Sequence, residues 1–146
     1  MAIYIGIDTG THTGIAVWDS LCHAFREIDC VKIHEAMRKV EAWKRLATDE
    51  GQHLEVRIED PRKRTWFGTE KMSREEERKR LQGVGSVKRD ASIWEDYLTD
   101  LDVAFEMIAP KRNVTKLTHE AFVALTKYTG RTNEHKRDAA MLVFGR

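Results

Sequence analysis

The stretch AIYIGIDTGTHTGIAVWD, residues 2–19, decides the fold of this chain. Two runs rich in β-branched and apolar residues, 2–8 and 14–19, flank a turn of Thr and Gly, a pattern typical of two adjacent strands. The first run ends on a carboxylate, Asp8. Because a strand-terminal Asp often only hydrogen-bonds its own turn, Asp8 indicates a function only if other polar residues join it.

The middle of the chain predicts a strand, a helix and another strand. Residues 22–29 predict a third strand in an antiparallel meander with the first two. Apolar residues at helical spacing predict a crossover helix over residues 32–50. Residues 53–60 predict a fourth strand, which again ends on carboxylates, Glu59 and Asp60.

The second half predicts a long helix and three shorter elements. Ser73 and Glu76 form a capping box that begins a helix reaching Leu98. Gly83 and Gly85 interrupt it at about 1 kcal/mol each relative to Ala, so we expect close approach to another backbone, in the sheet or in a second subunit. The remaining predicted elements are a strand over residues 103–110, a helix from Thr118 to Gly130 and a helix over residues 133–144. This order predicts an α/β fold with a five-stranded mixed sheet flanked by helices.

The composition predicts a single cytoplasmic domain over residues 1–146. The sequence is 41% hydrophobic and 34% charged, with no apolar run near the ~18 residues that a membrane span needs. No basic region precedes the apolar N-terminus, so we expect neither a signal peptide nor a membrane partner. Cys22 and Cys30 lack zinc-ligand spacing, and we expect both to be small packing residues.

Positive charge gathers in two stretches, although the net charge is only +1. Residues 61–90 contain ten Lys and Arg against five Asp and Glu, and residues 111–137 contain seven against two. Such stretches can bind a polyanion such as nucleic acid. They can equally be solvated helix faces with i,i+4 ion pairs, and the sequence leaves both interpretations open.

The predicted topology brings together four candidate metal ligands. Side chains at the carboxyl ends of neighbouring strands converge on one crevice in an α/β sheet, so we expect Asp8 and Glu59 to meet. His135 and Asp138 lie three residues apart and share one helix face, from which they can join the carboxylates. Carboxylates this close repel one another unless a cation such as Mg²⁺ neutralises them. Two such ions about 3.5–4 Å apart can activate water and stabilise the leaving oxygen in phosphodiester hydrolysis.

Four motifs follow one another along the chain: GIDTGTHTGIAV at residues 6–17, VRIED at 56–60, LQGVGSVKRDASIW at 81–94 and HKRDAAM at 135–141. In this order they resemble the RuvC family of Holliday-junction resolvases, in the RNase H-like superfamily, and the chain length is similar to that of compact phage versions. The resemblance implies an RNase H-like fold and a crossover junction endodeoxyribonuclease of DNA recombination and repair. Its catalytic and metal-binding residues would be Asp8, Glu59, His135 and Asp138, holding two Mg²⁺ ions per site, with Mn²⁺ as a substitute.

Candidate DNA-binding residues lie in two basic segments. IAPKRNVTK, residues 108–116, resembles the stretch in which the family carries DNA-contacting lysines, and this implies contacts from Lys111, Arg112 and Lys116. The loop RKRTWFG, residues 62–68, supplies as further candidates Arg62, Lys63, Arg64, Trp66 and Phe67. The two aromatic side chains can stack on unpaired bases at a junction or pack into the core, and both roles stay open.

The expected partner is branched DNA bound by a homodimer. Resolving a four-way junction requires two cuts related by two-fold symmetry, so a two-fold dimer is the economical geometry, with the long helix at its interface. Two other classes share the opening motif: YqgF-like RNase H-fold nucleases that act on RNA, and actin/hexokinase-type ATPases, which need two such domains. A DNA-binding module without activity is a further alternative. The preference among four-way junctions, flaps and forks stays open.

Overall fold

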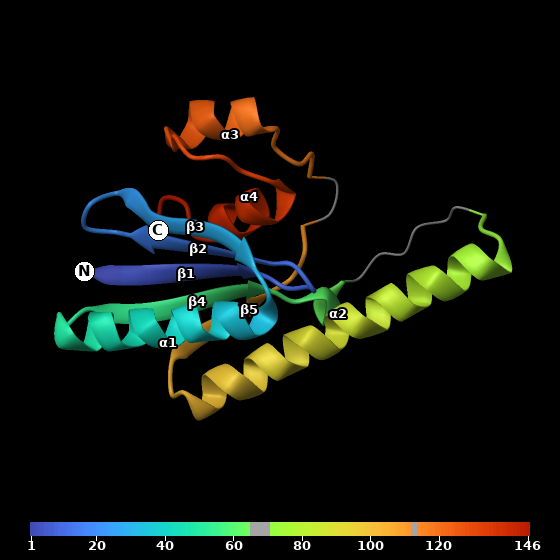
Figure 1. Cartoon of the computed structure of the whole chain (residues 1–146), viewed down its shortest axis with the longest axis horizontal. Coiled ribbons are helices and arrows are strands. Elements are labelled where there is room, and N and C mark those ends of the chain that lie inside the picture. The colour runs from blue at the N-terminus through green and yellow to red at the C-terminus, as the bar shows by residue number, and fades with distance from the viewer. Residues whose placement is uncertain (65–70, 112–113) are drawn as a thin grey trace.

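The computed structural model describes residues 1–64, 71–111 and 114–146, and within these ranges it contains five strands and four α-helices (Figure 1). The strands are β1 (Ala2–Asp8), β2 (Thr13–Asp19), β3 (Ala24–Val31), β4 (His53–Glu59) and β5 (Ala104–Ile108). The helices are α1 (Ile33–Asp49), α2 (Arg74–Asp100), α3 (His119–Thr126) and α4 (Glu134–Met141), with a short 3-10 helix, η1 (Pro61–Lys63), after β4.

All five strands belong to one mixed sheet in the order β3-β2-β1-β4-β5. β1, β2 and β3 pair antiparallel, as their short connections require. β4 is parallel to β1 and β5 is parallel to β4, because α1 and α2 carry the chain back between these strands. The predicted α/β fold with a five-stranded mixed sheet is confirmed, and its strand order and directions are compatible with an RNase H-like fold.

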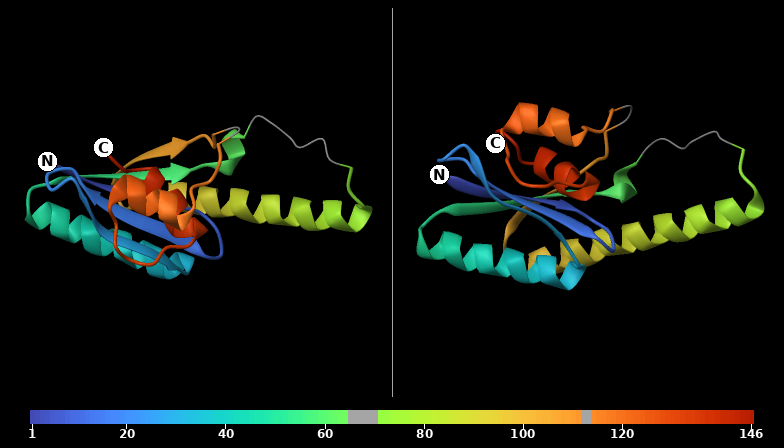
Figure 2. Two further views of the ribbon diagram at one scale, coloured as in Figure 1. Left: turned by 90° about the horizontal axis from the view of Figure 1, so that it is seen from above. Right: turned by 45° about the horizontal axis from the view of Figure 1, so that its top comes forward.

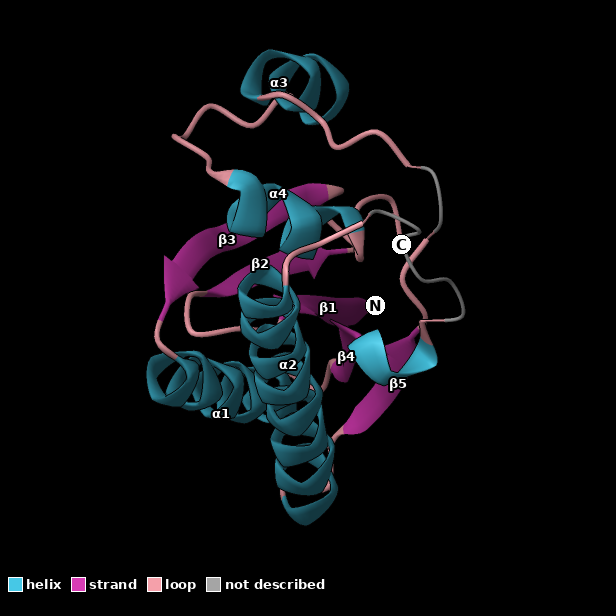
Figure 3. Ribbon diagram, turned by 90° about the vertical axis from the view of Figure 1, so that its right-hand side faces the viewer, coloured by secondary structure: helices cyan, strands magenta, loops and turns pink. Residues whose placement is uncertain are grey.

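Different helices cover the two faces of the sheet (Figure 3). Alternation along β1 sends Ile3, Ile5 and Ile7 to the face covered by α1 and α2. The buried partners that complete this core are Ile15, Val17, Ala36, Val40, Ala47, Leu54, Val56, Ile58, Trp94, Leu98 and Val103. Burying one such aliphatic side chain contributes about 1.5–3 kcal/mol, so this layer supplies much of the stability of the sheet.

The opposite face carries α4, with α3 outside it, as the turned views in Figure 2 show. Its buried residues are Ala16, Trp18, Ile28, Phe122, Ala139, Ala140 and Val143. Trp18 contacts Phe25 and Phe144 edge-on, with ring centroids 4.9 and 5.3 Å apart, and its indole N–H donates to the carbonyl of Arg146 over 3.1 Å. These contacts hold the last residues of the chain against the sheet.

Several element ends differ from the sequence-based expectation. Asp60 does not continue β4 but is buried and accepts a hydrogen bond from the backbone of Arg62, so it caps η1. α3 begins at its predicted cap, Thr118, but Lys127 in the left-handed conformation ends it, rather than Gly130. The last helix is also shorter than predicted, because a turn begins at Leu142.

Two of the packing expectations are wrong in part. Cys22 lies exposed in the turn between β2 and β3, while Cys30 is half-buried in β3, so only the second contributes to packing. Gly83 and Gly85 do not approach the sheet, because a Cβ added at either would meet no described atom within 4 Å, whereas their approach to a second subunit stays a prediction. The amino-terminal half of α2 is exposed and extends beyond the sheet (Figure 1).

The long helix α2 begins as the sequence predicts. The hydroxyl of Ser73 accepts from the backbone N–H of Glu76 at 3.2 Å, and the Glu76 carboxylate accepts from the backbone N–H of Ser73 at 3.0 Å. Both halves of the capping box are therefore formed. Within the described ranges, neither α2 nor any other helix is long and apolar enough to cross a membrane.

α4 lies unusually close to the backbones of β1 and β2. A Cβ at Gly6 would lie 2.1 Å from the carbonyl oxygen of Ala139, and a Cβ at Gly14 would lie 2.1 Å from the carbonyl oxygen of His135. A glycine inside a strand often marks such a close approach of another backbone. The carboxyl end of α4 is also fixed, because Arg57 of β4 donates to the carbonyl of Leu142 at 3.0 Å.

Alanine at either strand glycine should push α4 away from the sheet. We expect Gly6→Ala and Gly14→Ala each to lower the free energy of unfolding by about 1–3 kcal/mol, because the added methyl group meets backbone that cannot rotate away. Urea unfolding measures the change. The control is Gly83→Ala, at an open helical position, which should keep stability or raise it by up to about 1 kcal/mol. Wild-type stability in both strand variants would contradict the close packing.

Candidate active site

The carboxyl ends of β1 and β4 place two acidic residues side by side. Ile7 pairs with Ile58 across these parallel strands, and both face the core beneath α1 and α2. The next residue on each strand is Asp8 or Glu59, so both side chains emerge on the other face, toward α4. Asp8 and Glu59 therefore lie near each other, as predicted from the ends of these two strands.

α4 adds His135 and Asp138 above this edge. The Nδ1 atom of His135 lies 2.8 Å from the Oδ2 atom of Asp8. Because a carboxylate can only accept a hydrogen bond, Nδ1 carries the proton in this pair, and a neutral imidazole then keeps the lone pair of Nε2. The close contact of Gly14 with the carbonyl of His135 fixes the start of α4 at this place.

The acidic side chains influence one another electrostatically. Burial raises the pKa of Asp8; the hydrogen bond from His135 opposes that rise, and the charge of Asp138 adds to it. Burial also raises the pKa of Glu59, and the charges of Asp8 and Asp138 raise it further. Three carboxylates from β1, β4 and α4 therefore form one coupled negative cluster, which we call the acidic cluster: Asp8, Glu59 and Asp138.

Lys116 supplies positive charge to the acidic cluster. Its Nζ atom lies 2.6 Å from the Oδ2 atom of Asp138 and also donates to the carboxylate of Glu134. Burial alone would lower the pKa of Lys116, but the hydrogen bonds to Asp138 and Glu134 raise it above its ordinary value. The charge of Lys116 in turn opposes the rise in the pKa values of Asp8 and Glu59, which burial nevertheless keeps above their ordinary values.

The acidic cluster has the ligand type of a hard divalent cation but is not arranged as a metal site. In the parts of the chain that the structure describes, no group of three or more His, Cys, Asp or Glu side chains is placed so that it could hold a metal ion. However, Asp8 and Glu59 offer carboxylate oxygens whose raised pKa values a nearby divalent ion would lower, and oxygen ligands are those that Mg²⁺ prefers. His135 adds an imidazole nitrogen beside Asp8.

The predicted DNA-binding residues have different surroundings. Arg62 is held by ion pairs with Asp60 at 2.9 Å and Glu95 at 2.6 Å, so it fastens η1 to α2. Lys63 donates to the carbonyl of Met107 at 2.7 Å. Arg64 and Lys111 are exposed, and Lys116 lies at the acidic cluster as described above. The predicted contacts that lie outside the described residues are Trp66, Phe67 and Arg112.

Sequence reasoning missed two residues beside the acidic cluster. The ring of His12, in the turn between β1 and β2, lies 6.4 Å from that of His135, centroid to centroid. Buried Thr13 shapes this turn by donating to the carbonyl of Gly10 at 3.0 Å. The second missed residue is Glu134, in the first turn of α4. His12 belongs to the opening motif, but no pattern in the sequence predicts that it lies near His135.

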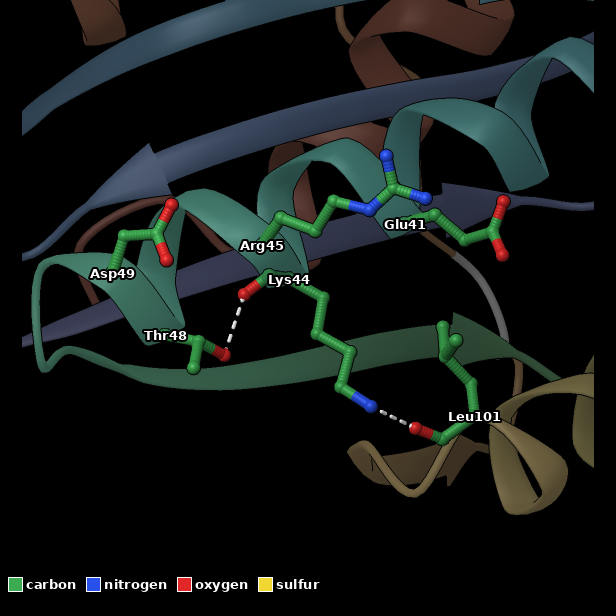
Figure 4. A pocket seen from close by; sticks show the side chains of 6 residues that line it. All are labelled: Glu41, Lys44, Arg45, Thr48, Asp49 and Leu101. Carbon is green, nitrogen blue, oxygen red and sulfur yellow. Dashed lines mark hydrogen bonds between the residues drawn. The ribbon is translucent and has the colours of Figure 1, made fainter.

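A hollow lies between the carboxyl ends of α1 and α2, and no residue of the acidic cluster lines it. It has a volume of about 420 Å³ and is lined by Glu41, Lys44, Arg45, Thr48, Asp49 and Leu101 (Figure 4). Lys44 donates to the carbonyl of Leu101, and Thr48 donates to the carbonyl of Lys44. The first of these bonds ties α1 to the end of α2, so we give this hollow a structural role.

No protein-family model matches the chain, and no curated protein matches it. The resemblance to the RuvC family therefore stays a hypothesis that four motifs carry. Function has to be inferred from the geometry and charge of the acidic cluster, His135 and Lys116.

Neutralising Glu59 should stabilise the metal-free protein at neutral pH. Because folding raises the pKa of Glu59, the folded state binds this proton more tightly than the unfolded state does. The wild type therefore loses stability as the pH rises above the ordinary value of 4.5, and Glu59→Gln avoids that loss. We expect the variant to be more stable at pH 7, with a difference that shrinks toward pH 4.

Urea unfolding at several pH values in a chelating buffer provides the measurement. Glu50→Gln, at an exposed position at the end of α1, is the matched control and should change stability by less than about 0.5 kcal/mol. A Glu59→Gln variant that is less stable than wild type at pH 7 would show that Glu59 is not under repulsion.

Proposed function

We propose that this protein is a metal-dependent, structure-selective endodeoxyribonuclease that hydrolyses phosphodiesters in branched DNA such as Holliday junctions. One observation carries the proposal: carboxylates from β1, β4 and α4 form a coupled acidic cluster beside His135. Such a cluster suits divalent ions that act on phosphate esters. The RuvC-like motifs supply the same residues and agree with this chemistry.

Each side chain of the site has a definite task in this proposal. Asp8, Glu59, Asp138 and His135 would hold Mg²⁺ or Mn²⁺, which supplies an acidified water and neutralises the leaving oxygen. Asp8 accepts from Nδ1 of His135 and so fixes the orientation of the ring. The one remaining lone pair, on Nε2, then has one of two tasks: it binds the metal, or it takes the proton of a water whose oxygen bonds to phosphorus as one P–O ester bond breaks.

Basic residues beside the acidic cluster support a nucleic-acid substrate. Lys116 lies at the cluster itself, and Lys111 is exposed on the same connection after β5. Lys63 and Arg64 follow the strand that carries Glu59. Cations at such positions can contact phosphates on either side of the reacting one, which fixes the position of the strand without reading its sequence.

α2 carries a stripe that supports pairing with a second copy. Glu77, Leu81, Val84 and Lys88 are spaced so that they share one helix face, and all four are exposed. Among the described residues, neither Glu77 nor Lys88 has an ion-pair partner. In an antiparallel two-fold pairing, Leu81 meets the partner's Val84, and Glu77 meets the partner's Lys88. This symmetry places one acidic cluster on each subunit, as two symmetric cuts require.

Neutral substitutions in the acidic cluster test the proposed chemistry. We expect Asp8→Asn, Glu59→Gln and Asp138→Asn each to lower the cleavage rate by orders of magnitude, because each removes a negative oxygen ligand. His135→Ala should cause a clear but smaller loss. Cleavage is measured with labelled four-way junction, flap, duplex and RNA–DNA hybrid, each with Mg²⁺ and Mn²⁺.

Junction binding, measured by mobility shift, should survive these substitutions, which separates lost chemistry from lost folding. Asp100→Asn, at an exposed carboxylate at the end of α2, is the matched control and should cleave like wild type. Wild-type cleavage by Asp8→Asn would falsify the proposed site. A preference for the RNA–DNA hybrid over branched DNA would reject the substrate class.

Charge reversal on α2 tests the dimer. Glu77→Lys or Lys88→Glu alone places like charges opposite each other in the two-fold pairing, so each should weaken dimerisation by about two- to fivefold in Kd. The double variant restores opposite charges and should recover the wild-type Kd, as measured by analytical ultracentrifugation at low salt. Additive weakening in the double variant, or a wild-type protein that stays monomeric with junction DNA, would contradict this interface.

A further inference from the structure

Two carboxylates of α4 hold the ammonium group of Lys116. The acceptors, Glu134 and Asp138, lie one helical turn apart and so share a face of α4. Lys116 reaches them from the connection between β5 and α3. Asp138 belongs to the acidic cluster, because its charge raises the pKa of both Asp8 and Glu59, whereas Glu134 is the acceptor of Lys116 outside the cluster.

The Lys116 ammonium and a divalent ion have to share Asp138. The Oδ2 atom of Asp138 lies 2.6 Å from Nζ of Lys116, which is full hydrogen-bond contact. A cation bound by Asp8, Glu59 and Asp138 draws on the same carboxylate and repels the ammonium. Glu134 is a second acceptor that the ammonium already contacts and that is not needed by the cation.

We propose that Lys116 is a built-in counter-ion that a divalent metal displaces from Asp138, and that Glu134 is a positioning residue that retains the displaced ammonium beside the acidic cluster. There the ammonium can contact a phosphate of the bound strand. This inference rests on the proposed function, because it requires that the acidic cluster binds metal.

The roles of the two residues follow from charge and reach. An ammonium has three N–H donors, so it can leave Asp138 while it keeps its bond to Glu134. With Lys116 near the acidic cluster, the metal-free carboxylates remain partly neutralised, as the lowering of the Asp8 and Glu59 pKa values by Lys116 indicates. Without Glu134, the ammonium would have Asp138 alone as its acceptor and would compete more strongly with the metal.

Calorimetric titration with Mn²⁺, in the absence of DNA, tests the competition. We expect Lys116→Met to bind Mn²⁺ about two- to fivefold more tightly than wild type, the range that corresponds to one partly exposed ion pair. Lys116→Arg keeps the positive charge and should stay close to wild type. The matched control is Lys127→Met, at an exposed lysine after α3, which should leave Mn²⁺ affinity unchanged.

Glu134→Gln should weaken Mn²⁺ binding, and most of this effect should disappear when Lys116 is already Met. The double-mutant cycle thereby separates competition by Lys116 from the general loss of a negative charge. In cleavage assays, Glu134→Gln should lower kcat about two- to fivefold while junction affinity is kept or increased, and Glu134→Asp should restore part of the rate. A purely structural role of Glu134 predicts no such difference between the effect on kcat and the effect on junction affinity.

The outcomes separate the two proposals. If wild type shows no saturable Mn²⁺ binding, both the proposed function and this inference are rejected. If wild type binds Mn²⁺ but Lys116→Met binds it no more tightly, the inference alone is rejected. The inference alone is also rejected if Glu134→Gln weakens Mn²⁺ binding equally in the presence and in the absence of the Lys116 ammonium.

Discussion

Close contact between α4 and the backbones of β1 and β2 is the constraint on which the candidate site depends. Glycines at positions 6 and 14 let the helix approach to a distance that any side chain would prevent. This approach brings His135 to hydrogen-bond distance of Asp8 and carries Asp138 to within electrostatic reach of Glu59. At the other end of the helix, Arg57 of the neighbouring strand β4 donates a hydrogen bond to the carbonyl of Leu142. The geometry of the acidic cluster is therefore set by packing, before any ligand binds.

Much of the fold could be predicted, because hydrophobic period and turn chemistry are local signals. The alternation in residues 2–19 and the Ser73–Glu76 capping box are both formed as expected. The errors lie at the ends of the elements. Asp60 turns into the cap of η1 because it meets Arg62, and α3 ends early because Lys127 adopts a left-handed conformation that no sequence rule assigns to lysine.

The site could be predicted only in part. Convergence of Asp8 and Glu59 follows from parallel strand register, and the spacing of His135 and Asp138 follows from helical geometry. The ion pairs of Lys116 depend on the path of the connection after β5, which local patterns do not specify. Arg62 had the same positive charge as its neighbours in the sequence, yet its pairs with Asp60 and Glu95 give it a structural task.

The distance along the chain between Asp8 and His135 has a consequence for biosynthesis. These residues are 127 positions apart, and all five strands precede α4 in the sequence. A growing chain can therefore pair its sheet while the helix that brings His135 and Asp138 is still unmade, since domains fold from the amino end during translation. The nascent protein then carries Asp8 and Glu59 without their partners. The two α4 residues of the candidate site are therefore added only after all five strands have been synthesised.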